Sequence, residues 1–257
     1  MACLLRADFP SDRPVFREDY APVDNAELFY REGGRGRPII VLHGGPDFDH
    51  SYLLPELGLL SDSFRLIYYD QRGRGKSCGS VHPEDVSIRS DVQDIESLRE
   101  YFQLESLVVL GHSWGGLLAM EYAIRHPGCV SHMILMNTAP ASHDDYMLLQ
   151  QDRRQRAFAD VEEQKARSAD ARYQEGDPDT VAEYYRVHFR ATLKQPEHLE
   201  SLIASLRRNF TKEGILKARA IEARLMNETW LASEYDLLSG LKRLSIPTLV
   251  LLREFGH

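Results

Sequence analysis

The sequence has few cysteines, no long apolar run and no excess of basic residues. Its three cysteines, Cys3, Cys78 and Cys129, are odd in number and lack the spacing of zinc ligands, so they predict neither a disulfide framework nor a metal site. No stretch of about 18 apolar residues is present, which argues against a membrane-spanning helix. A formal net charge of -8 argues against nucleic acid and anionic membranes as partners.

The amino terminus also lacks the pattern of a secretion signal. Charged residues appear at Arg6 and Asp8, before an apolar core of sufficient length can form, so we expect a cytoplasmic protein. Internal repeats and low-complexity linkers are missing as well. A chain of 257 residues with 43% hydrophobic content is therefore expected to bury one large core, either as a single domain or as a core domain with an insertion.

One stretch combines a buried strand, a glycine-rich turn and a helix. Four apolar residues at 107–110 lead into Gly111-His112-Ser113-Trp114-Gly115, and a helical pattern continues to about Arg125. Glycines on both sides of Ser113 permit a strained turn, and side chains at positions 111 and 115 are expected to collide with neighbouring elements. Such a turn exposes the Ser113 hydroxyl to a substrate. The alternative is an ordinary surface serine in a glycine-rich loop, and the strand and helix context argues against it.

The rest of the pattern alternates strands with helices. Apolar strands are expected at 38–42, 64–69 and 130–136, and an amphipathic helix is expected over 88–102. Two short antiparallel strands are expected to precede them within 15–32. This alternation is typical of an α/β protein with a mainly parallel sheet that is flanked by helices.

The pattern changes after residue 139, where charged and helical sequence replaces buried strands until the sheet resumes at 246–252. We interpret residues 140–233 as an inserted helical cap. Residues 1–139 and 234–257 then form the core domain.

Three loops follow successive strands of the predicted sheet. They read His43-Gly44-Gly45-Pro46, Asp70-Gln71-Arg72-Gly73 and Gly111-His112-Ser113-Trp114-Gly115. Together they resemble the α/β-hydrolase superfamily, and the first two resemble its prolyl iminopeptidase branch. The resemblance covers about residues 15–140 and 234–252. It implies an α/β-hydrolase fold with a helical cap, in which Ser113 is the catalytic nucleophile and forms an acyl intermediate.

The resemblance also implies the groups that bind the oxyanion. These are the backbone N–H groups of Trp114 and Gly45, with Gly44 adjacent, because donors that are fixed before the reaction stabilise the developing charge. The family implies no metal and no organic cofactor.

Other residues of the three loops have structural roles in the family. In the family, the histidines equivalent to His43 and His112 make structural hydrogen bonds. The alternative is that one of them is the catalytic base. Asp70 and the arginines of its loop are expected to join loops through ion pairs, whereas Arg72 is also an alternative partner for a carboxylate substrate.

The acid and the base of the catalytic triad are not identifiable in the sequence. The family places the acid in a Gly-x-x-Asp turn after the strand equivalent to 246–252, and the histidine after one further helix and strand. Here the turn has Gly256 in place of the aspartate, and the further strand is absent. Three explanations compete for the missing acid and base. The chain is a fragment or has an altered end, or it is a pseudoenzyme, or its triad is rewired. A rewired triad would use His257 as base and Asp144 or Asp145 as acid, although those aspartates are also typical of a helix start.

The substrate is a small molecule or a short peptide on this interpretation. An aminopeptidase must neutralise the free amine of its substrate, and the cap offers several acids, most of which are expected to be solvated: Glu162, Glu163, Glu183, Glu222 and Glu228. Family members specific for N-terminal proline carry further glycines after His-Gly-Gly-Pro and a tryptophan-glutamate signature in the cap. This chain has Asp47-Phe48-Asp49 there and Trp230 as the sole cap tryptophan. A small-acyl esterase, amidase or lactonase is therefore an alternative, and a catalytically inactive fragment or ligand-binding pseudoenzyme is an alternative of another class.

Overall fold

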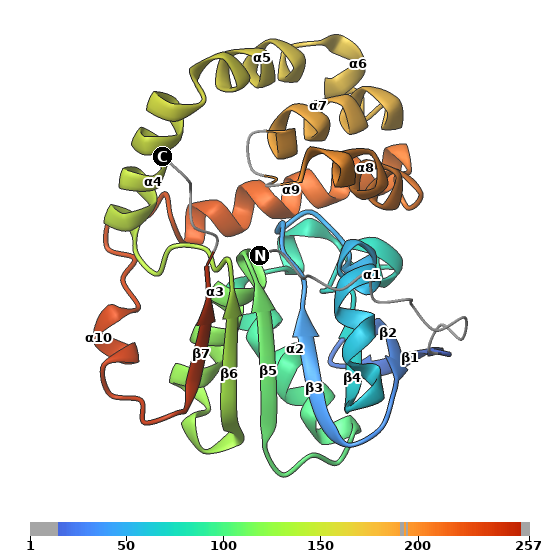
Figure 1. Ribbon diagram of the computed structural model, residues 1–257, viewed down its shortest axis with the longest axis vertical. Coiled ribbons are helices and arrows are strands. Elements are labelled where there is room, and N and C mark those ends of the chain that lie inside the picture. The colour runs from blue at the N-terminus through green and yellow to red at the C-terminus, as the bar shows by residue number, and fades with distance from the viewer. Residues whose placement is uncertain (1–14, 191–192, 194, 253–257) are drawn as a thin grey trace, which may run out of the picture.

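The computed structural model describes residues 15–190, 193 and 195–252, and its centre is a single seven-stranded sheet (Figure 1). The strand order is β1-β2-β4-β3-β5-β6-β7. The pairs from β4 to β7 are parallel, whereas β1 pairs antiparallel with β2, and β2 with β4. This confirms the predicted α/β class. The strands are β1 (Arg17–Val23), β2 (Ala26–Gly33), β3 (Arg37–Leu42), β4 (Phe64–Tyr69), β5 (Leu107–His112), β6 (Val130–Met136) and β7 (Thr248–Leu251).

Both faces of the central strands are buried, because successive side chains point to opposite sides of a sheet. Ile40 and Val109 pack into the cluster that includes residues of α2 and α3, while Ile39 and Val108 pack into a second cluster with residues of and near α1. The strands were therefore predictable as continuous apolar runs. The helices are α1 (Leu54–Leu57), α2 (Ile88–Tyr101), α3 (Trp114–Arg125), α4 (His143–Arg156), α5 (Phe158–Ser168), α6 (Ala171–Gln174), α7 (Pro178–Arg190), α8 (Leu199–Arg207), α9 (Lys212–Glu228) and α10 (Leu238–Leu241).

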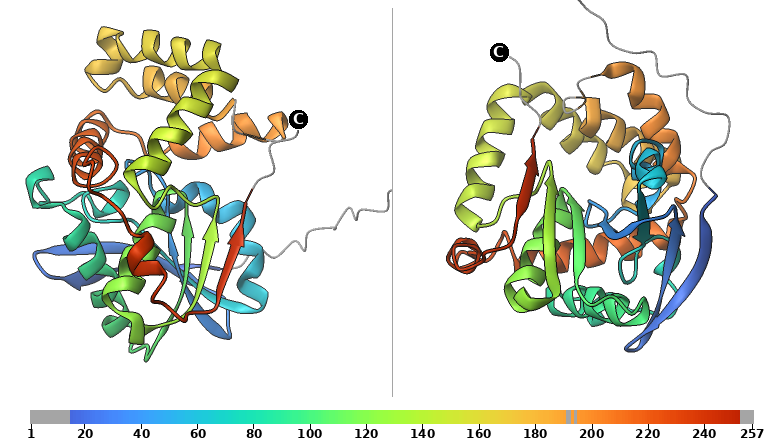
Figure 2. Two further views of the ribbon diagram at one scale, coloured as in Figure 1. Left: turned by 90° about the vertical axis from the view of Figure 1, so that its left-hand side faces the viewer. Right: turned by 60° about the horizontal axis from the view of Figure 1, so that its bottom comes forward.

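Helices α4 to α9, which we call the helical insert, lie between β6 and β7 in the chain and stand over the carboxyl ends of the parallel strands (Figures 1 and 2). The insert has its own apolar cluster, which includes Tyr185, Ile203 and Ile215. Phe48, from the loop after β3, joins that cluster, with its ring 4.9 Å from that of Tyr185. The insert is thereby packed against the loop that follows β3. None of the described helices is long and apolar enough to cross a membrane.

The last strand differs from its prediction. The apolar run at 246–252 forms a strand only over Thr248–Leu251, and this strand pairs with β6 on one side. Leu249, Val250 and Leu251 are each about half exposed. In the part of the chain that the structure describes, no element packs as a layer on β7, so its apolar sequence is not matched by burial.

Candidate active site

Ser113 lies at the junction of β5 and α3, in the turn that the glycine pattern predicts. Its backbone has φ 52° and ψ -116°, a conformation that costs about 1 to 3 kcal/mol for a residue with a side chain. The turn is held from β6 and the loop after it, because Ser113 N–H donates to Met136 O at 3.1 Å and Ala139 N–H donates to Ser113 O at 3.0 Å. The Ser113 side chain is partly exposed.

The flanking glycines are required by close backbone contacts, as predicted. A methyl group at Gly111 would lie 2.3 Å from Gly115 O, and one at Gly115 would lie 2.1 Å from Leu42 O. Both neighbours are backbone atoms of packed strands or helices, so neither can move away easily. The turn at Ser113 is thus fixed between β3 and α3.

The loop after β3 passes directly against the serine. A methyl group placed on Gly44 would lie 3.2 Å from Ser113 Cβ and 3.1 Å from His112 Nδ1. The Gly44 N–H donates to the Tyr52 hydroxyl at 2.8 Å, so this amide is already in use. Of the three residues predicted at the oxyanion hole, Gly44 is a close neighbour of Ser113, and the donor roles of Gly45 and Trp114 stay predictions.

The two histidines of the loops occupy different environments. His43 is fully buried, and its Nε2 accepts from Gln71 N–H at 3.0 Å while Nδ1 donates to Gly44 O at 2.7 Å. Burial lowers its pKa to about 3. Since both ring nitrogens of His43 are engaged, it has no nitrogen left to accept a proton from Ser113. His112 is partly exposed, and burial of its ring lowers its pKa to about 4.

The arginines of the Asp70 loop form buried ion pairs, which join the loop to α2 and not, as expected, to another loop. Arg72 Nε donates to Asp94 Oδ2 at 2.9 Å, and Arg74 pairs with Asp91. Both guanidinium groups are at least nine-tenths buried. The alternative that Arg72 binds a carboxylate substrate is therefore wrong, because its charge is enclosed and neutralised by Asp94.

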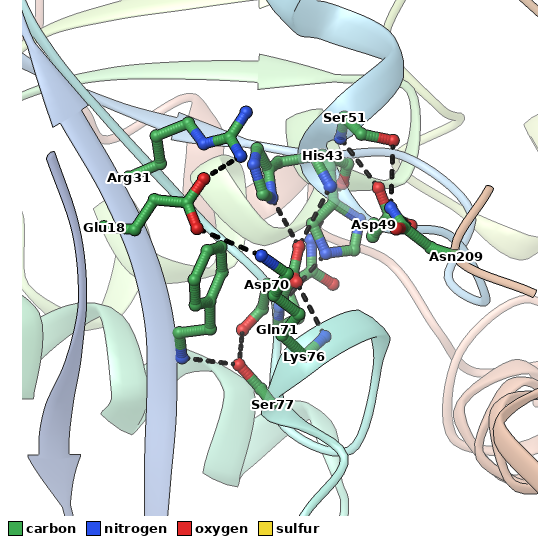
Figure 3. Close-up of polar contacts among 12 residues, drawn as sticks. Glu18, Arg31, His43, Asp49, Ser51, Asp70, Gln71, Lys76, Ser77 and Asn209 are labelled. Carbon is green, nitrogen blue, oxygen red and sulfur yellow. Dashed lines mark hydrogen bonds and ion pairs between the residues drawn. The ribbon is translucent and has the colours of Figure 1, made fainter. Parts of the chain in front are cut away.

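Asp70 itself anchors the neighbouring backbone (Figure 3). Its Oδ1 lies 2.6 Å from His50 Nδ1, and its Oδ2 accepts from Lys76 N–H at 2.8 Å. Burial disfavours its charge, but the nearby His50 outweighs burial and holds the pKa of Asp70 at about 2. This pair was not predictable from the sequence, because the partner of Asp70 comes from a segment 20 residues away.

A metal site at this pair is not supported. In the described part of the chain, Asp49, His50 and Asp70 offer ligand atoms within 4.8 Å of one another. However, Asp49 already accepts from Ser51 N–H at 2.7 Å and from Asn209 at 2.9 Å. The carboxylates are thus occupied by hydrogen bonds that give them structural roles.

The candidate acids of the insert fall into two groups. Four have a basic partner on their own helix, as solvated acids commonly do: Glu162 with Lys165, Glu163 with Arg167, Glu183 with Arg186, and Glu228 with Arg224. Glu222 differs, because it forms no ion pair among the described residues, although Arg219 stands three residues before it on α9 and its charge lowers the pKa of Glu222. Arg219 instead donates to Tyr173 O at 2.6 Å and lies over the Tyr173 ring. The sequence pattern alone therefore did not single out Glu222.

Glu222, on α9 of the insert, lies within the electrostatic influence of Asp47, in the loop after β3. Burial, followed by the charge of Asp47, raises the pKa of Glu222 to about 8. Burial likewise raises the pKa of Asp47 to about 6, and its Oδ2 accepts a hydrogen bond from the Tyr185 hydroxyl. Two carboxyl groups that are costly to ionise are therefore Asp47, two residues beyond Gly45, and Glu222, on α9.

Comparison with known proteins identifies the family of this chain. Residues 37–251 match the alpha/beta hydrolase fold family. The chain belongs to this family. A proline iminopeptidase of Lactobacillus helveticus is 38% identical over 128 residues, which are 47% of this chain and 43% of that protein. The predicted resemblance to the prolyl iminopeptidase branch is thereby confirmed, over a stretch that spans less than half of the curated relative's length.

Solved structures show the same fold for this alpha/beta hydrolase. The crystal structure of a proline iminopeptidase from Mycobacterium smegmatis matches with a TM-score of 0.63 and 22% identity, over 91% of this chain and 80% of that one. A thermophilic esterase from Thermogutta terrifontis matches with a TM-score of 0.61 and 24% identity, over 94% of this chain and 80% of that one. At these identities the likeness extends to the fold alone.

Of the residues considered for the acid and the base of the triad, some lie outside the described residues and others have structural roles. Gly256 and His257 lie outside the described residues, so the prediction for His257 stays a prediction. Ser142 caps α4 by accepting from Asp145 N–H at 3.1 Å, and Asp144 and Asp145 occupy the first turn of that helix. The two aspartates thus have the helix-start role that the sequence offered as the alternative to catalysis.

Proposed function

We propose that this alpha/beta hydrolase cleaves an ester or amide bond of a small substrate through an acyl intermediate on Ser113. The observation that carries the proposal is the strained turn that presents Ser113 to the loop of Gly44 and Gly45. A strained, partly exposed serine beside a loop of backbone amides supplies a nucleophile and a binding place for an oxyanion.

The proposed reaction has two halves. Ser113 Oγ attacks the substrate carbonyl, its proton passes through a base to the leaving amine or alcohol, and water then hydrolyses the acyl ester. The N–H groups of Gly45 and Trp114 stabilise the oxyanion in each half, and each such donor contributes about 3 to 4 kcal/mol. Trp114 is suited to this role because it is the first residue of α3, where backbone N–H groups lack an acceptor in their own helix.

We assign the helical insert as the cap over Ser113, and Glu222 and Asp47 as the groups that receive the substrate's amine. An ammonium group between them would restore the charge on both carboxyls, because a nearby positive charge lowers their pKa. The other four candidate acids, Glu162, Glu163, Glu183 and Glu228, have basic partners on their own helices and are less suited to the role. This favours an aminopeptidase that resembles the proline iminopeptidases.

Substrate comparison tests the proposal. We expect turnover of L-proline 4-nitroanilide that is lost in Ser113→Ala and reduced at least about tenfold in kcat/KM by Glu222→Gln. The matched control is Glu183→Gln, which removes an exposed acid paired with Arg186 and should leave kcat/KM unchanged. Turnover of 4-nitrophenyl acetate without turnover of the arylamide would establish the esterase alternative. Turnover of neither substrate would favour the inactive, ligand-binding alternative.

A further inference from the structure

Tyr52 connects the two loops that meet at Ser113. Its hydroxyl oxygen accepts from Gly44 N–H at 2.8 Å and lies 2.6 Å from His112 Nδ1. Gly44 belongs to the loop after β3, whereas His112 is the last residue of β5 and immediately precedes Ser113. One phenol group therefore bridges the loop after β3 and the end of β5, and Tyr52 lies 60 residues before His112 in the sequence.

The direction of the second hydrogen bond follows from the first. The Tyr52 oxygen already accepts from Gly44, and its single proton needs an acceptor in this partly buried place. Burial disfavours the charged form of His112, so Nδ1 of the neutral ring is available as that acceptor. Tyr52 thus donates to His112 Nδ1, and the ring proton of His112 resides on Nε2.

Tyr52 stands on a rigid support. It lies in a short 3-10 helix, His50–Leu53, whose first N–H donates to Asp70 Oδ1 at 3.1 Å. Asp49 caps the same turn by accepting from Ser51 N–H (Figure 3). The Tyr52 ring also packs edge-on against the rings of His112, at 5.5 Å, and of Phe48, at 5.9 Å.

We propose that Tyr52 is a positioning residue for the oxyanion hole of Ser113. By holding the Gly44 amide and His112 together, it fixes the peptide of Gly45 relative to the nucleophile and keeps the Gly44 amide away from the substrate oxygen. Donors aligned before reaction are effective because no energy is spent in moving them. This inference rests on the proposed function for its kinetic consequence, whereas the state of His112 that it specifies does not depend on activity.

Two measurements on Tyr52→Phe test the proposal, with Tyr68→Phe as the matched control. The Tyr68 hydroxyl is buried and has no hydrogen-bond partner among the described residues, so its removal deletes no such bond. The first measurement is the rate of labelling by a fluorophosphonate, whose phosphoryl oxygen occupies the oxyanion site. We expect labelling of Tyr52→Phe to be about 10 to 100 times slower than labelling of the wild type. Tyr68→Phe should be labelled at the wild-type rate.

The second measurement is the ¹⁵N chemical shift of the His112 ring nitrogens. The wild type and Tyr68→Phe should show the Nε2–H tautomer, and Tyr52→Phe should show a mixture of tautomers because Nδ1 has lost its donor. An unchanged His112 signature in Tyr52→Phe would overturn the proposal, as would a labelling rate within about twofold of the wild type. If the wild-type chain is not labelled at all, the proposed function fails, and the His112 signature alone decides the role of Tyr52.

Discussion

Replacement of Glu222 by glutamine should make the protein more stable at alkaline pH. The pKa of Glu222 is raised from an ordinary value of 4.5 to about 8, so between these values the carboxyl is protonated in the folded chain and ionised in the unfolded chain. The folded state then binds more protons than the unfolded state, and stability falls as the pH rises. This difference in the pKa of Glu222 between the unfolded and folded chain lowers the free energy of unfolding by an amount on the order of 3 to 5 kcal/mol. The loss is complete above about pH 8.

Urea denaturation from about pH 5 to pH 9 measures this effect. Glutamine keeps the size of the side chain and cannot ionise, so Glu222→Gln and the wild type should be similarly stable near pH 5, and the variant should be several kcal/mol more stable near pH 9. Subtraction of the two profiles removes the contributions of other titrating groups. Glu183→Gln is the control and should follow the wild-type profile. Parallel profiles for the wild type and Glu222→Gln would refute the assignment of Glu222 as a carboxyl that is costly to ionise.

Three further substitutions test the architecture around the site. Gly115→Ala places a methyl group 2.1 Å from Leu42 O, so thermal unfolding should show a loss of about 1 to 3 kcal/mol, and wild-type stability would contradict the close contact. Arg74→Met leaves Asp91 buried without its partner and should lower the free energy of unfolding by about 3 to 5 kcal/mol. The double variant with Asp91→Leu should recover most of this loss. Equal losses in the single and double variants would argue against the pair. Ser113→Gly relieves a positive φ and should raise stability by about 1 kcal/mol, whereas an unchanged midpoint would show that the turn is not strained.

Features encoded by neighbouring residues were predictable from the sequence. The turn at Ser113 follows from glycines two residues to either side of it, and the buried strands follow from apolar runs. The start of α4 follows from Ser142 with acids in the next turn, which is a local helix signal. The exposure of β7 was not predictable, because an apolar run specifies a strand but does not specify what covers it.

Contacts between distant segments were beyond the sequence. Tyr52 meets His112 only because β3 lies beside β5 in the sheet, and His50 meets Asp70 only because the loop after β3 folds over the end of β4. The distinction of Glu222 among the acids of the insert was also beyond the sequence. Arg219 stands three positions before Glu222, as a helical ion-pair partner would, and the influence of Asp47 on Glu222 depends on the packing of the insert against the sheet.

The most direct test of the account is to locate the site of covalent labelling by a fluorophosphonate. The protein is treated with the probe and digested, and the modified peptide is sequenced by mass spectrometry. We predict a single modification on Ser113, which is absent from Ser113→Ala and from protein unfolded in urea before treatment. Modification of another serine, or no modification of the folded chain, would contradict the role of Ser113 as the nucleophile.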